Sequence, residues 1–470
     1  MTRNIIIKRT AEKFLARWLQ KNNRKPLVLR GARQVGKSTL VRQFAKANNL
    51  ILHEVNLERH LKLTDVFASH NTNRILKEIE FICQKGPVNT PGSLLFLDEI
   101  QAVPITIQTL RYFYEDYPDL AIISAGSLLE FSLSKHSYSM PVGRIEYFFL
   151  GPVTFEEVLL AFDEKDLLDL LTSYSFPDAL PHTAHARLLE ILRVFFLIGG
   201  MPEAVQTYID THDLNSVFEV HSSILETYRD DFAKYSTQAD LLRLHRVFDY
   251  IPLAAGSKLK YVNIDPNEQA RSLARAVDLL VKAQVIMKAY HTNASGIPLN
   301  ATVNYKKFKI FFMDCGLMNS MCQIQWISPD DLKKKDFINK GSIAEQFIAQ
   351  HLAFSKNNKR PFLTYWLREQ RSSNAEIDFI IQQGKDILPV EVKAGKSGSL
   401  KSLLQFVYQK QILTALRFDM NTPTLQKAEH VIKQSEDIVK VSFDLLSMPI
   451  YMAGQTQRIL MEYMGSVKNN

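Results

Sequence analysis

Cysteine is scarce in this sequence, and the few cysteines form no recognisable group. The chain of 470 residues has 3 of them, Cys83, Cys315 and Cys322, with no CxxC pair and no metal-ligand cluster. This pattern excludes a cysteine-based zinc site and a disulfide-stapled fold. We expect reduced thiols, mostly in the core of a cytoplasmic protein.

Long apolar runs are lacking as well. The most apolar stretch, Val194 to Gly200, is much shorter than the ~20 residues that a membrane-spanning helix needs. The opening segment, Met1 to Lys8, has too short an apolar run for a signal peptide. The sequence also shows no internal repeat and no low-complexity tract. We therefore expect no membrane partner.

What is present is an ordinary globular composition with a basic balance. Hydrophobic residues make up 46% and charged residues 23% of the chain. A chain of this length is expected to divide into about three domains. The net charge of +8 suits an acidic partner such as nucleic acid. It equally suits a protein that is merely basic, so the charge alone does not decide.

Strands and helices alternate through the first third of the chain. Short apolar runs predict strands, and the segments between them predict helices. The expected strands are residues 26–29, 50–57, 93–97, 120–123 and 145–150, and the expected helices are 37–48, 75–83 and 105–114. This alternation predicts an α/β fold with a parallel sheet, and we assign residues 1–160 to it.

The remainder is predicted to divide into three segments. Residues 161–235 have a helical, lid-like pattern, and residues 336–470 form a last α/β unit after a charged linker at 329–336. Between them, residues 236–325 have two helices followed by two strands, which is typical of a winged helix. The main elements expected there and beyond are helices at 241–251, 267–282, 342–354 and 400–410, strands at 285–290, 309–313 and 363–366, and a hairpin at 377–392.

A phosphate-binding motif follows the first expected strand. Residues 31–38 have the pattern G-x-x-x-x-G-K-[ST] between a strand and a helix. Gly31 and Gly36 let backbone N–H groups turn toward phosphate oxygens. Lys37 places a positive charge on the β- and γ-phosphates, Ser38 offers its hydroxyl to Mg²⁺, and Thr39 continues the motif into the helix. The alternative is a glycine turn with an incidental lysine.

Two carboxylates end the third expected strand. Asp98 and Glu99 follow the apolar run 94–97, and the carboxyl ends of parallel strands face the ligand crevice. Asp98 is expected to reach the Mg²⁺ shell through water, and Glu99 to act as the general base on the attacking water. Together with the phosphate loop, this pair favours ATP and Mg²⁺ as ligands over solvated acids at a strand end.

Three further side chains are weaker candidates. Ser124 and Ser127 stand at and just after the fourth strand, where a sensor of the γ-phosphate is expected, although a serine in a turn fits as well. Arg144 would serve as an arginine finger on the nucleotide of a neighbouring subunit, which implies a homo-oligomer. A surface salt bridge is the alternative for Arg144.

These motifs together resemble the bacterial and archaeal AAA+ superfamily ATPases with a C-terminal domain of uncharacterised function. The resemblance covers nearly the whole chain and implies ATP binding and hydrolysis. The family more often has threonine before the glycine of residues 124–127, so the resemblance does not fix the sensor residue. The matching pieces are GARQVGKST at 31–39, LDEIQ at 97–101, AGS at 125–127, GR at 143–144, PVTFEE at 152–157, GGMPE at 199–203 and MDCGL at 313–317.

A second group of charged residues lies in the last α/β unit. Asp378 stands inside the apolar run 377–381, and the returning strand ends in Glu391, Val392 and Lys393. Period-two alternation puts Glu391 and Lys393 on one face of that strand. The hairpin is expected to bring Asp378 close to the same face.

This arrangement resembles the PD-(D/E)xK core of restriction endonucleases. The resemblance implies that Asp378 and Glu391 are ligands of a divalent metal such as Mg²⁺, that Lys393 helps to activate water, and that Glu345 is the helical acid. So short a pattern also arises by chance. The pattern fits a nuclease-like fold that binds nucleic acid without cutting it as well as it fits an active nuclease.

The sequence favours an ATPase whose nucleotide state controls a C-terminal nucleic-acid-binding or nuclease-like module. Arg271, Arg275 and Lys282 lie on the second helix of the winged segment. This helix either enters a DNA major groove or simply presents a basic face to solvent. The alternative function is a non-catalytic, ATP-gated DNA-binding regulator or scaffold with a degenerate nuclease fold.

Overall fold

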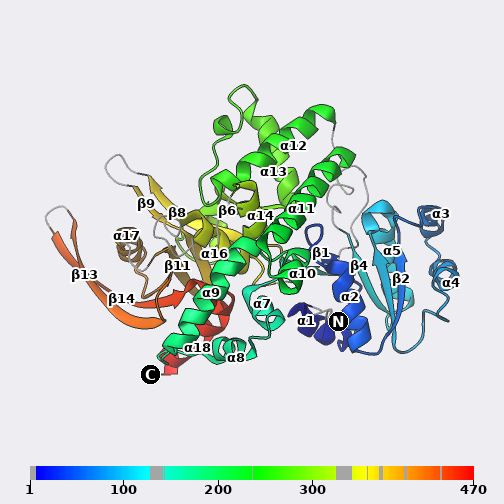
Figure 1. Ribbon diagram of the computed structural model, residues 1–470, viewed down its shortest axis with the longest axis horizontal. Coiled ribbons are helices and arrows are strands. Elements are labelled where there is room, and N and C mark those ends of the chain that lie inside the picture. The colour runs from blue at the N-terminus through cyan, green and yellow to red at the C-terminus, as the bar shows by residue number, and fades with distance from the viewer. Residues whose placement is uncertain are drawn as a thin grey trace.

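The computed structural model describes residues 7–126, 141, 143–235, 237–323, 341–356, 358–369, 374–395, 400–434 and 437–469. Figure 1 shows an N-terminal α/β region at one end of the molecule, helices in the middle and mixed sheets at the other end. Among the helices of these residues, none combines the length and apolar character that a bilayer crossing requires.

A five-stranded parallel sheet organises the N-terminal region in the order β2-β3-β4-β1-β5. Strands β1, β3 and β4 are buried along their whole length, as expected for a sheet covered on both faces. The α/β fold predicted for this region is confirmed. The strands are β1 (Leu27–Arg30), β2 (Ile51–Asn56), β3 (Ser93–Asp98), β4 (Ala121–Ala125) and β5 (Glu146–Phe149).

Alternate residues of these strands face two separate cores. Leu29 and Phe96 face the core under α1 (Ala11–Leu19) and α2 (Lys37–Ala47). Val28 and Leu97 face the core under three other helices. Those helices are α3 (Leu63–Ala68), α4 (Thr72–Cys83) and α5 (Ile105–Asp116). Because both faces are covered, a ligand can approach the strands only at an edge where they end.

Helices make up the middle of the chain. Thr154 and Glu157 form a capping box that fixes the start of the first of them, α7. Gly199, with a φ of +67°, ends α9, and Pro202 starts α10. The helices are α7 (Phe155–Ala161), α8 (Lys165–Ser173), α9 (His182–Ile198), α10 (Pro202–Thr211), α11 (Leu214–Tyr235), α12 (Gln238–Tyr250), α13 (Ala270–Lys282) and α14 (Cys315–Met321).

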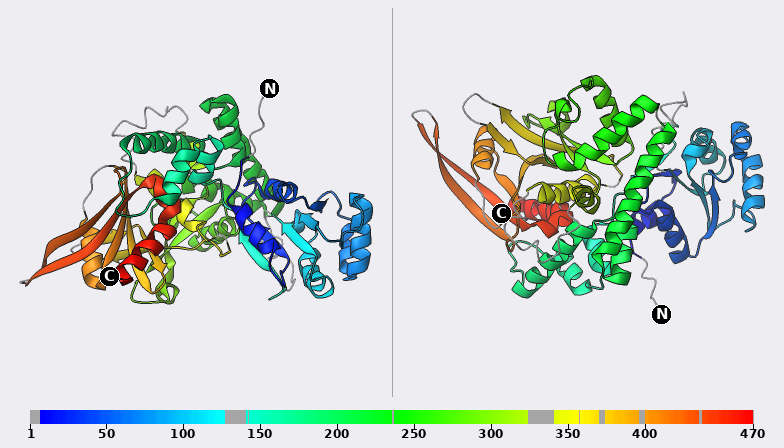
Figure 2. Two further views of the ribbon diagram at one scale, coloured as in Figure 1. Left: turned by 90° about the horizontal axis from the view of Figure 1, so that it is seen from below. Right: turned by 45° about the horizontal axis from the view of Figure 1, so that its top comes forward.

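Two further sheets complete the fold, in the orders β7-β6-β8-β9 and β10-β11-β12-β14-β13. The hairpin β13–β14 extends away from the body of the molecule (Figure 2). The strands are β6 (Ile286–Thr292), β7 (Val303–Phe312), β8 (Leu363–Glu369), β9 (Asn374–Ile377), β10 (Phe379–Gln383), β11 (Asp386–Val392), β12 (Thr414–Asp419), β13 (Thr424–Gln434) and β14 (Asp437–Pro449). The accompanying helices are α16 (Gly341–Ala353), α17 (Lys401–Lys410) and α18 (Thr456–Asn469), with helical turns η4 (Leu299–Thr302) and η7 (Ile450–Gln455).

Strand β6 joins two of the predicted segments. It pairs antiparallel with β7, as expected for the wing of a winged helix, and parallel with β8, where Tyr290 lies opposite Thr364. The interval predicted to separate two domains, residues 325–336, therefore falls between strands of one sheet. Strand β8 covers the edge of β6 that a free wing would expose. The predicted linker at 329–336 lies outside the described residues.

The middle helices and the C-terminal sheets also share one core. The ring of Phe155 in α7 lies 5.9 Å from that of Phe195 in α9, 6.2 Å from that of Phe347 in α16 and 6.3 Å from that of Tyr451 in η7. All four side chains are buried. Segments almost 300 residues apart in sequence are thus packed as one body.

A close backbone approach fastens α14 to the end of α9. A Cβ added at Gly316 would lie 2.5 Å from the backbone nitrogen of Gly199. We expect Gly316→Ala to lower the free energy of unfolding by about 1–3 kcal/mol, because backbone atoms cannot give way cheaply. Thermal denaturation measures the effect. Gly465→Ala in α18, where an added Cβ meets nothing within 4 Å, is the matched control, and equal melting temperatures of the two variants would contradict this contact.

Candidate functional site

The phosphate loop joins β1 to α2 at the carboxyl edge of the parallel sheet. Gly36, directly before α2, has a φ of +89°, a conformation that favours glycine. A Cβ at Gly31 would lie 2.5 Å from the carbonyl oxygen of Leu150. The backbone path of the loop thus requires both glycines of the motif.

Lys37 folds back onto the loop. Its side chain is buried, and its Nζ donates hydrogen bonds to the carbonyl oxygens of Gly31 (3.0 Å) and Ala32 (2.8 Å). Burial lowers the pKa of Lys37 to about 8, against the opposite effect of Glu99 and Asp98. Phosphate oxygens are stronger partners for an ammonium than neutral carbonyl groups, so Lys37 is placed to exchange these bonds for a triphosphate.

Distant parts of the chain hold two other carbonyl groups of the loop. Arg9 Nη1 donates to the carbonyl oxygen of Val35 (2.9 Å), and Tyr228 Oη, from α11, donates to that of Arg33 (2.7 Å). Asp231, also in α11, pairs with the Arg33 guanidinium. These bonds turn loop carbonyl groups toward the protein, as an anion site built from N–H groups requires.

Asp98 and Ser38 are in direct contact. Asp98 ends β3, and its Oδ2 accepts a hydrogen bond from Ser38 Oγ at 2.6 Å. Burial raises the pKa of Asp98, the Ser38 hydrogen bond opposes this, and Glu99 adds to it. Glu99 has a φ of +53° and accepts a hydrogen bond from the Gln101 amide. Both predicted acids therefore lie at the carboxyl edge of the parallel sheet, where the phosphate loop leads into α2.

These side chains fit a magnesium nucleotide. A hydroxyl and a carboxylate are the hard oxygen ligands that Mg²⁺ prefers, and Ser38 and Asp98 already meet. Lys37 and the amino end of α2 supply positive charge for phosphates. Glu99 adds a second carboxylate directly after Asp98.

The remaining predicted residues of this site differ in whether their side chains could reach a nucleotide. Thr39 is exposed on α2. Ser124 is fully buried, and its hydroxyl bonds the carbonyl oxygen of Leu27 (3.5 Å) inside the sheet, so its position does not suit a phosphate sensor. Ser127 lies outside the described residues.

Arg144 lies on the surface of the N-terminal region. Its Nε is 3.3 Å from Glu115 Oε1, its guanidinium lies 5.7 Å from the centre of the Tyr114 ring, and its side chain is 46% exposed. Within one chain this is the surface salt bridge of the alternative interpretation. A finger role would require a second copy of the chain beside it.

The acids of the predicted C-terminal site gather around a lysine that the sequence patterns did not single out. The side chain of Lys309, in β7, is 2% exposed, and its Nζ lies 3.2 Å from Glu345 Oε2 and 3.5 Å from Asp378 Oδ1. It also pairs with Glu376. Burial opposes the charge of Lys309, but Glu345, Asp378 and Glu376 outweigh burial and raise its pKa. An ammonium therefore occupies the position at which these carboxylates would meet a metal cation.

Glu391 and Lys393 pair with each other beside this cluster. Asp378, at the break between β9 and β10, accepts a hydrogen bond from the Val392 N–H at 2.8 Å. Burial, aided by Asp378, raises the pKa of Glu391. Over the described ranges, no group of three or more His, Cys, Asp or Glu residues is arranged to hold a metal ion. The expected metal role of Asp378 and Glu391 thus does not fit this arrangement, because Lys309 already supplies the positive charge.

Some residues at these sites could not be found from the motifs. Arg9 is buried between the phosphate loop and Glu157, with Nε 2.9 Å from Glu157 Oε2. Tyr228 and Asp231 have no local pattern that indicates contact with a loop some 195 residues away. Lys309 did leave a signal, since it is a lysine inside the apolar run 308–313.

Three family models match successive parts of the chain. Residues 23–159 match the AAA domain, residues 189–328 match a domain of unknown function (DUF8612), and residues 340–451 match a domain of unknown function (DUF4143). No curated protein matches the chain.

Solved structures with detectable similarity include three from different organisms. The Aeropyrum pernix ORC2 protein, solved in ADPNP-ADP complexes, is 13% identical, covers 67% of this chain and 92% of its own, and has a TM-score of 0.32. The Thermotoga maritima RuvB Holliday junction branch migration motor is 16% identical and has a TM-score of 0.29, and the alignment covers 60% of this chain and 90% of RuvB. C. elegans PCH-2 is 11% identical, with 46% and 70% covered and a TM-score of 0.29.

Proposed function

We propose, from the premise that the chain carries an AAA-family P-loop domain followed by two domains of unknown function, that it is a magnesium-dependent ATPase. We further propose that its nucleotide state controls a C-terminal nucleic-acid-binding or nuclease-like module. The observation that carries this proposal is the position of Tyr228. Its hydroxyl contacts the phosphate loop at Arg33 and, at 3.5 Å, the Sδ of Met313, which follows β7 directly.

The ATPase part rests on the side chains at the loop. Lys37 leaves the carbonyl oxygens of Gly31 and Ala32 and binds phosphate oxygens of ATP. Ser38 and Asp98 are the oxygen donors for Mg²⁺, which, when bound, neutralises charge on the phosphates. Glu99 accepts a proton from the attacking water. Arg144 would stabilise the charge that develops on the transferred phosphoryl group if a second copy presented it to the site.

The coupling part rests on β7. At its end, Phe312 packs against Phe248 of α12, with ring centres 5.6 Å apart, and Met313 touches Tyr228. Three residues before Phe312, Lys309 reaches the C-terminal acids. A shift of the loop at Arg33 can therefore reach the acid cluster through α11 and one strand, all by packed contacts.

We expect nucleotide binding to change amide hydrogen exchange in β7, and Tyr228→Phe to weaken that response. The substitution removes the hydroxyl that holds the Arg33 carbonyl group, so some nucleotide affinity should be lost, and both proteins are compared at saturating nucleotide. Exchange over residues 303–312 is measured by mass spectrometry with and without a non-hydrolysable ATP analogue and Mg²⁺. Tyr408→Phe in α17 is the matched control. An unchanged response in Tyr228→Phe, or none in the unaltered protein, would rule out this route.

A second function is favoured by Lys309. Because its ammonium already neutralises the acids, the C-terminal module is equally suited to be a non-catalytic, ATP-gated DNA-binding regulator with a degenerate nuclease fold. Incubation with supercoiled plasmid and Mg²⁺ or Mn²⁺ separates the two functions. Nicking that is lost in Asp378→Ala and Lys393→Ala would support a nuclease, and no nicking with any metal or nucleotide would support the regulator.

The proposal as a whole is tested by ATP hydrolysis with and without nucleic acid. At ATP concentrations below saturation, DNA or RNA is expected to change the rate of hydrolysis, because linkage makes coupling between two sites reciprocal in their binding equilibria and nucleic acid then alters the affinity for ATP. Hydrolysis that is identical under all conditions would disconnect the two halves of the chain. Absence of ATP binding in calorimetry, with Mg²⁺ present and the fold intact, would end the proposal.

A further inference from the structure

A row of three aromatic rings lies on the sheet β7-β6-β8, outside the sites described so far. Tyr290 of β6 is the middle ring, with Tyr305 of β7 at 5.1 Å and Phe362, directly before β8, at 5.7 Å. Tyr290 and Phe362 are nearly parallel, with an angle of 27° between ring planes. The two outer rings face solvent, since Tyr305 is 61% and Phe362 is 38% exposed.

The middle of the row is held firmly. The Tyr290 ring also packs against Phe308 in β7, 6.1 Å away, and Lys288 Nζ lies 4.3 Å from the centre of the Phe308 ring. Tyr290 lies opposite Phe308 in the paired strands, Tyr305 lies where the register between β6 and β7 shifts, and Phe362 directly precedes β8. Exposed rings that pack against such a held ring offer flat apolar faces, and an aromatic side chain has few rotatable bonds to immobilise.

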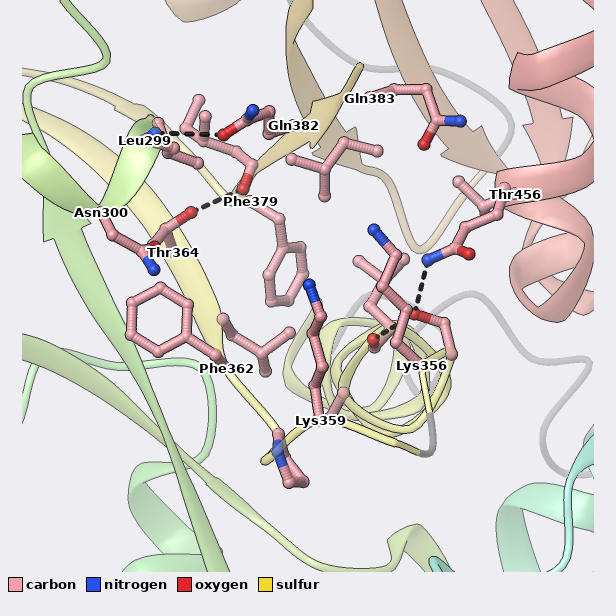
Figure 3. Close-up of a pocket in the computed structure, with 18 of the residues that line it drawn as sticks. Leu299, Asn300, Lys356, Lys359, Phe362, Thr364, Phe379, Gln382, Gln383 and Thr456 are labelled. Atoms are coloured by element: carbon pink, nitrogen blue, oxygen red, sulfur yellow. Dashed lines mark hydrogen bonds between the residues drawn. The ribbon is translucent and has the colours of Figure 1, made fainter. Parts of the chain in front are cut away.

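A cavity adjoins the row at Phe362. Its volume is about 530 Å³, and Figure 3 shows the side chains of Lys356 and Lys359 extending into it from the segment after α16. Gln382 and Gln383 lie on the opposite side. Arg360 is a third cationic residue of the lining, and among the described residues that line the cavity none is acidic. The cavity therefore favours an anion, and its size is within the ~300–1,000 Å³ typical of ligand pockets.

Two of the polar side chains there have structural partners. Thr364 donates to the carbonyl oxygen of Ile380 at 2.6 Å, and Gln382 accepts from the N–H of Leu299 at 3.1 Å (Figure 3). These bonds fix the walls of the cavity. The charge that a ligand would meet comes from the lysines on the other side.

We propose that this face binds single-stranded nucleic acid, with bases on Tyr305 and Phe362 and backbone phosphates at Lys356 and Lys359. Exposed rings beside a positive groove are the combination by which proteins bind single strands, because unstacked bases can stack on aromatic side chains. Bases within a duplex are stacked on one another and are not available to such rings. The inference rests on the nucleic-acid role proposed above but on no step of ATP hydrolysis.

A duplex would be expected at a different place. Arg271, Arg275 and Lys282 are exposed on α13, where a recognition helix of a winged segment would enter a groove. Binding at α13 and binding at the ring row are therefore distinguished by the form of the nucleic acid and by which residues matter.

The test is fluorescence anisotropy of a labelled oligonucleotide of about 20 nucleotides, longer than the ~4–16 nucleotides of typical single-strand sites. The full chain is used without nucleotide or divalent metal, and the same oligonucleotide is measured as a duplex. We expect the single strand to bind more tightly, and Tyr305→Ala with Phe362→Ala to weaken it by about tenfold or more. Tyr305→Phe, which keeps the ring, should bind as the unaltered protein does. Phe81→Ala, which removes a ring that is 79% exposed on α4, is the control.

The charge contribution is tested by reversal in pairs. Lys356→Glu with Lys359→Glu should weaken binding far more than Lys46→Glu with Lys77→Glu, which changes the net charge equally on exposed helix positions of the N-terminal region. The inference is overturned if the two pairs weaken binding equally, if the single strand does not bind, or if the duplex binds more tightly and only Arg271→Ala and Arg275→Ala reduce it. Calorimetry with ATP on the same preparations distinguishes failure of this inference from failure of the proposed ATPase. A protein that binds the single strand but not ATP would contradict only the proposed ATPase.

Discussion

Glu99→Gln is expected to stop ATP turnover while ATP still binds. The amide keeps the size of the side chain and one oxygen that accepts a hydrogen bond, but it cannot accept the proton of the attacking water. A positioned general base typically contributes about 10²–10⁴-fold, so turnover should fall by that order. Lys37→Ala should also abolish turnover, but by weakening the grip on phosphate, since Lys37 is the buried cation of the loop. Steady-state hydrolysis and calorimetry with Mg²⁺ and ATP measure the two effects.

The matched control for the first variant is Glu78→Gln. This residue is exposed on α4 and remote from the phosphate loop in sequence, so hydrolysis should remain normal. If Glu99→Gln hydrolyses ATP at the rate of the unaltered protein, Glu99 is not the base. Glutamate and glutamine meet the same conformational cost in the left-handed backbone at residue 99, so a folding defect is not expected to mask the result.

Lys309→Met should cause the largest loss of stability among single substitutions in the C-terminal region. The cluster contains four carboxylates, Glu345, Glu376, Asp378 and Glu391, and the ammonium groups of Lys309 and Lys393. Removal of one partner from a buried ionic group typically costs about 3–5 kcal/mol, because uncompensated charge stays behind. We expect a correspondingly lower melting temperature.

Manganese should partly restore the melting temperature of Lys309→Met and leave that of the unaltered protein unchanged. With the ammonium gone, a divalent cation is the natural counter-charge for carboxylate oxygens. Thermal denaturation with and without MnCl₂ measures both responses, and Lys306→Met, an exposed position on the same strand, is the control. A Lys309→Met protein as stable as the control would show that Lys309 is not the counter-ion. A manganese effect on the unaltered protein would show that the lysine does not exclude metal.

The N-terminal fold could be predicted because its signals are local. Strands β1, β3 and β4 of the parallel sheet are short, largely apolar runs buried on both faces, and the phosphate loop follows β1 without interruption. Glycine positions 31 and 36 are fixed by contacts and dihedral angles that any chain with this motif must meet. The closeness of Ser38 and Asp98 agrees with the rule that parallel strands end at the same edge, whereas their direct hydrogen bond is visible only in the structure.

The contacts around that loop could not be predicted, because they depend on tertiary packing. Arg9, Tyr228 and Asp231 approach the loop from segments with no motif of their own. Ser124 illustrates the same limit, since its strand-end position fits a sensor or a turn, while its hydroxyl bonds the Leu27 carbonyl oxygen inside the sheet. Single-sequence patterns report which residues are apolar, but not which element packs against which.

The C-terminal region was only partly predictable. The two-residue spacing of Glu391, in β11, and Lys393, directly after it, agrees with the ion pair that they form. The break at Asp378, which sends β9 and β10 into different sheets, cannot be read from the continuous apolar run around it. Strands β13 and β14 give no clear strand signal, because they carry many polar residues, as in TLQKAEHVIKQ, and extend outward with Val431 67% exposed.

The pairing of β6 with β8 limits how such a chain can be rearranged. The two matched regions of unknown function meet between residues 328 and 340, yet hydrogen bonds of a single ladder cross that junction. A fragment starting after the junction would keep β8 and β9 but lose the neighbour that seals them, and its bare edge would invite aggregation. Recombination that exchanged either half alone would likewise break the pairing of β6 with β8. The two halves are therefore expected to be inherited, expressed and purified as one unit.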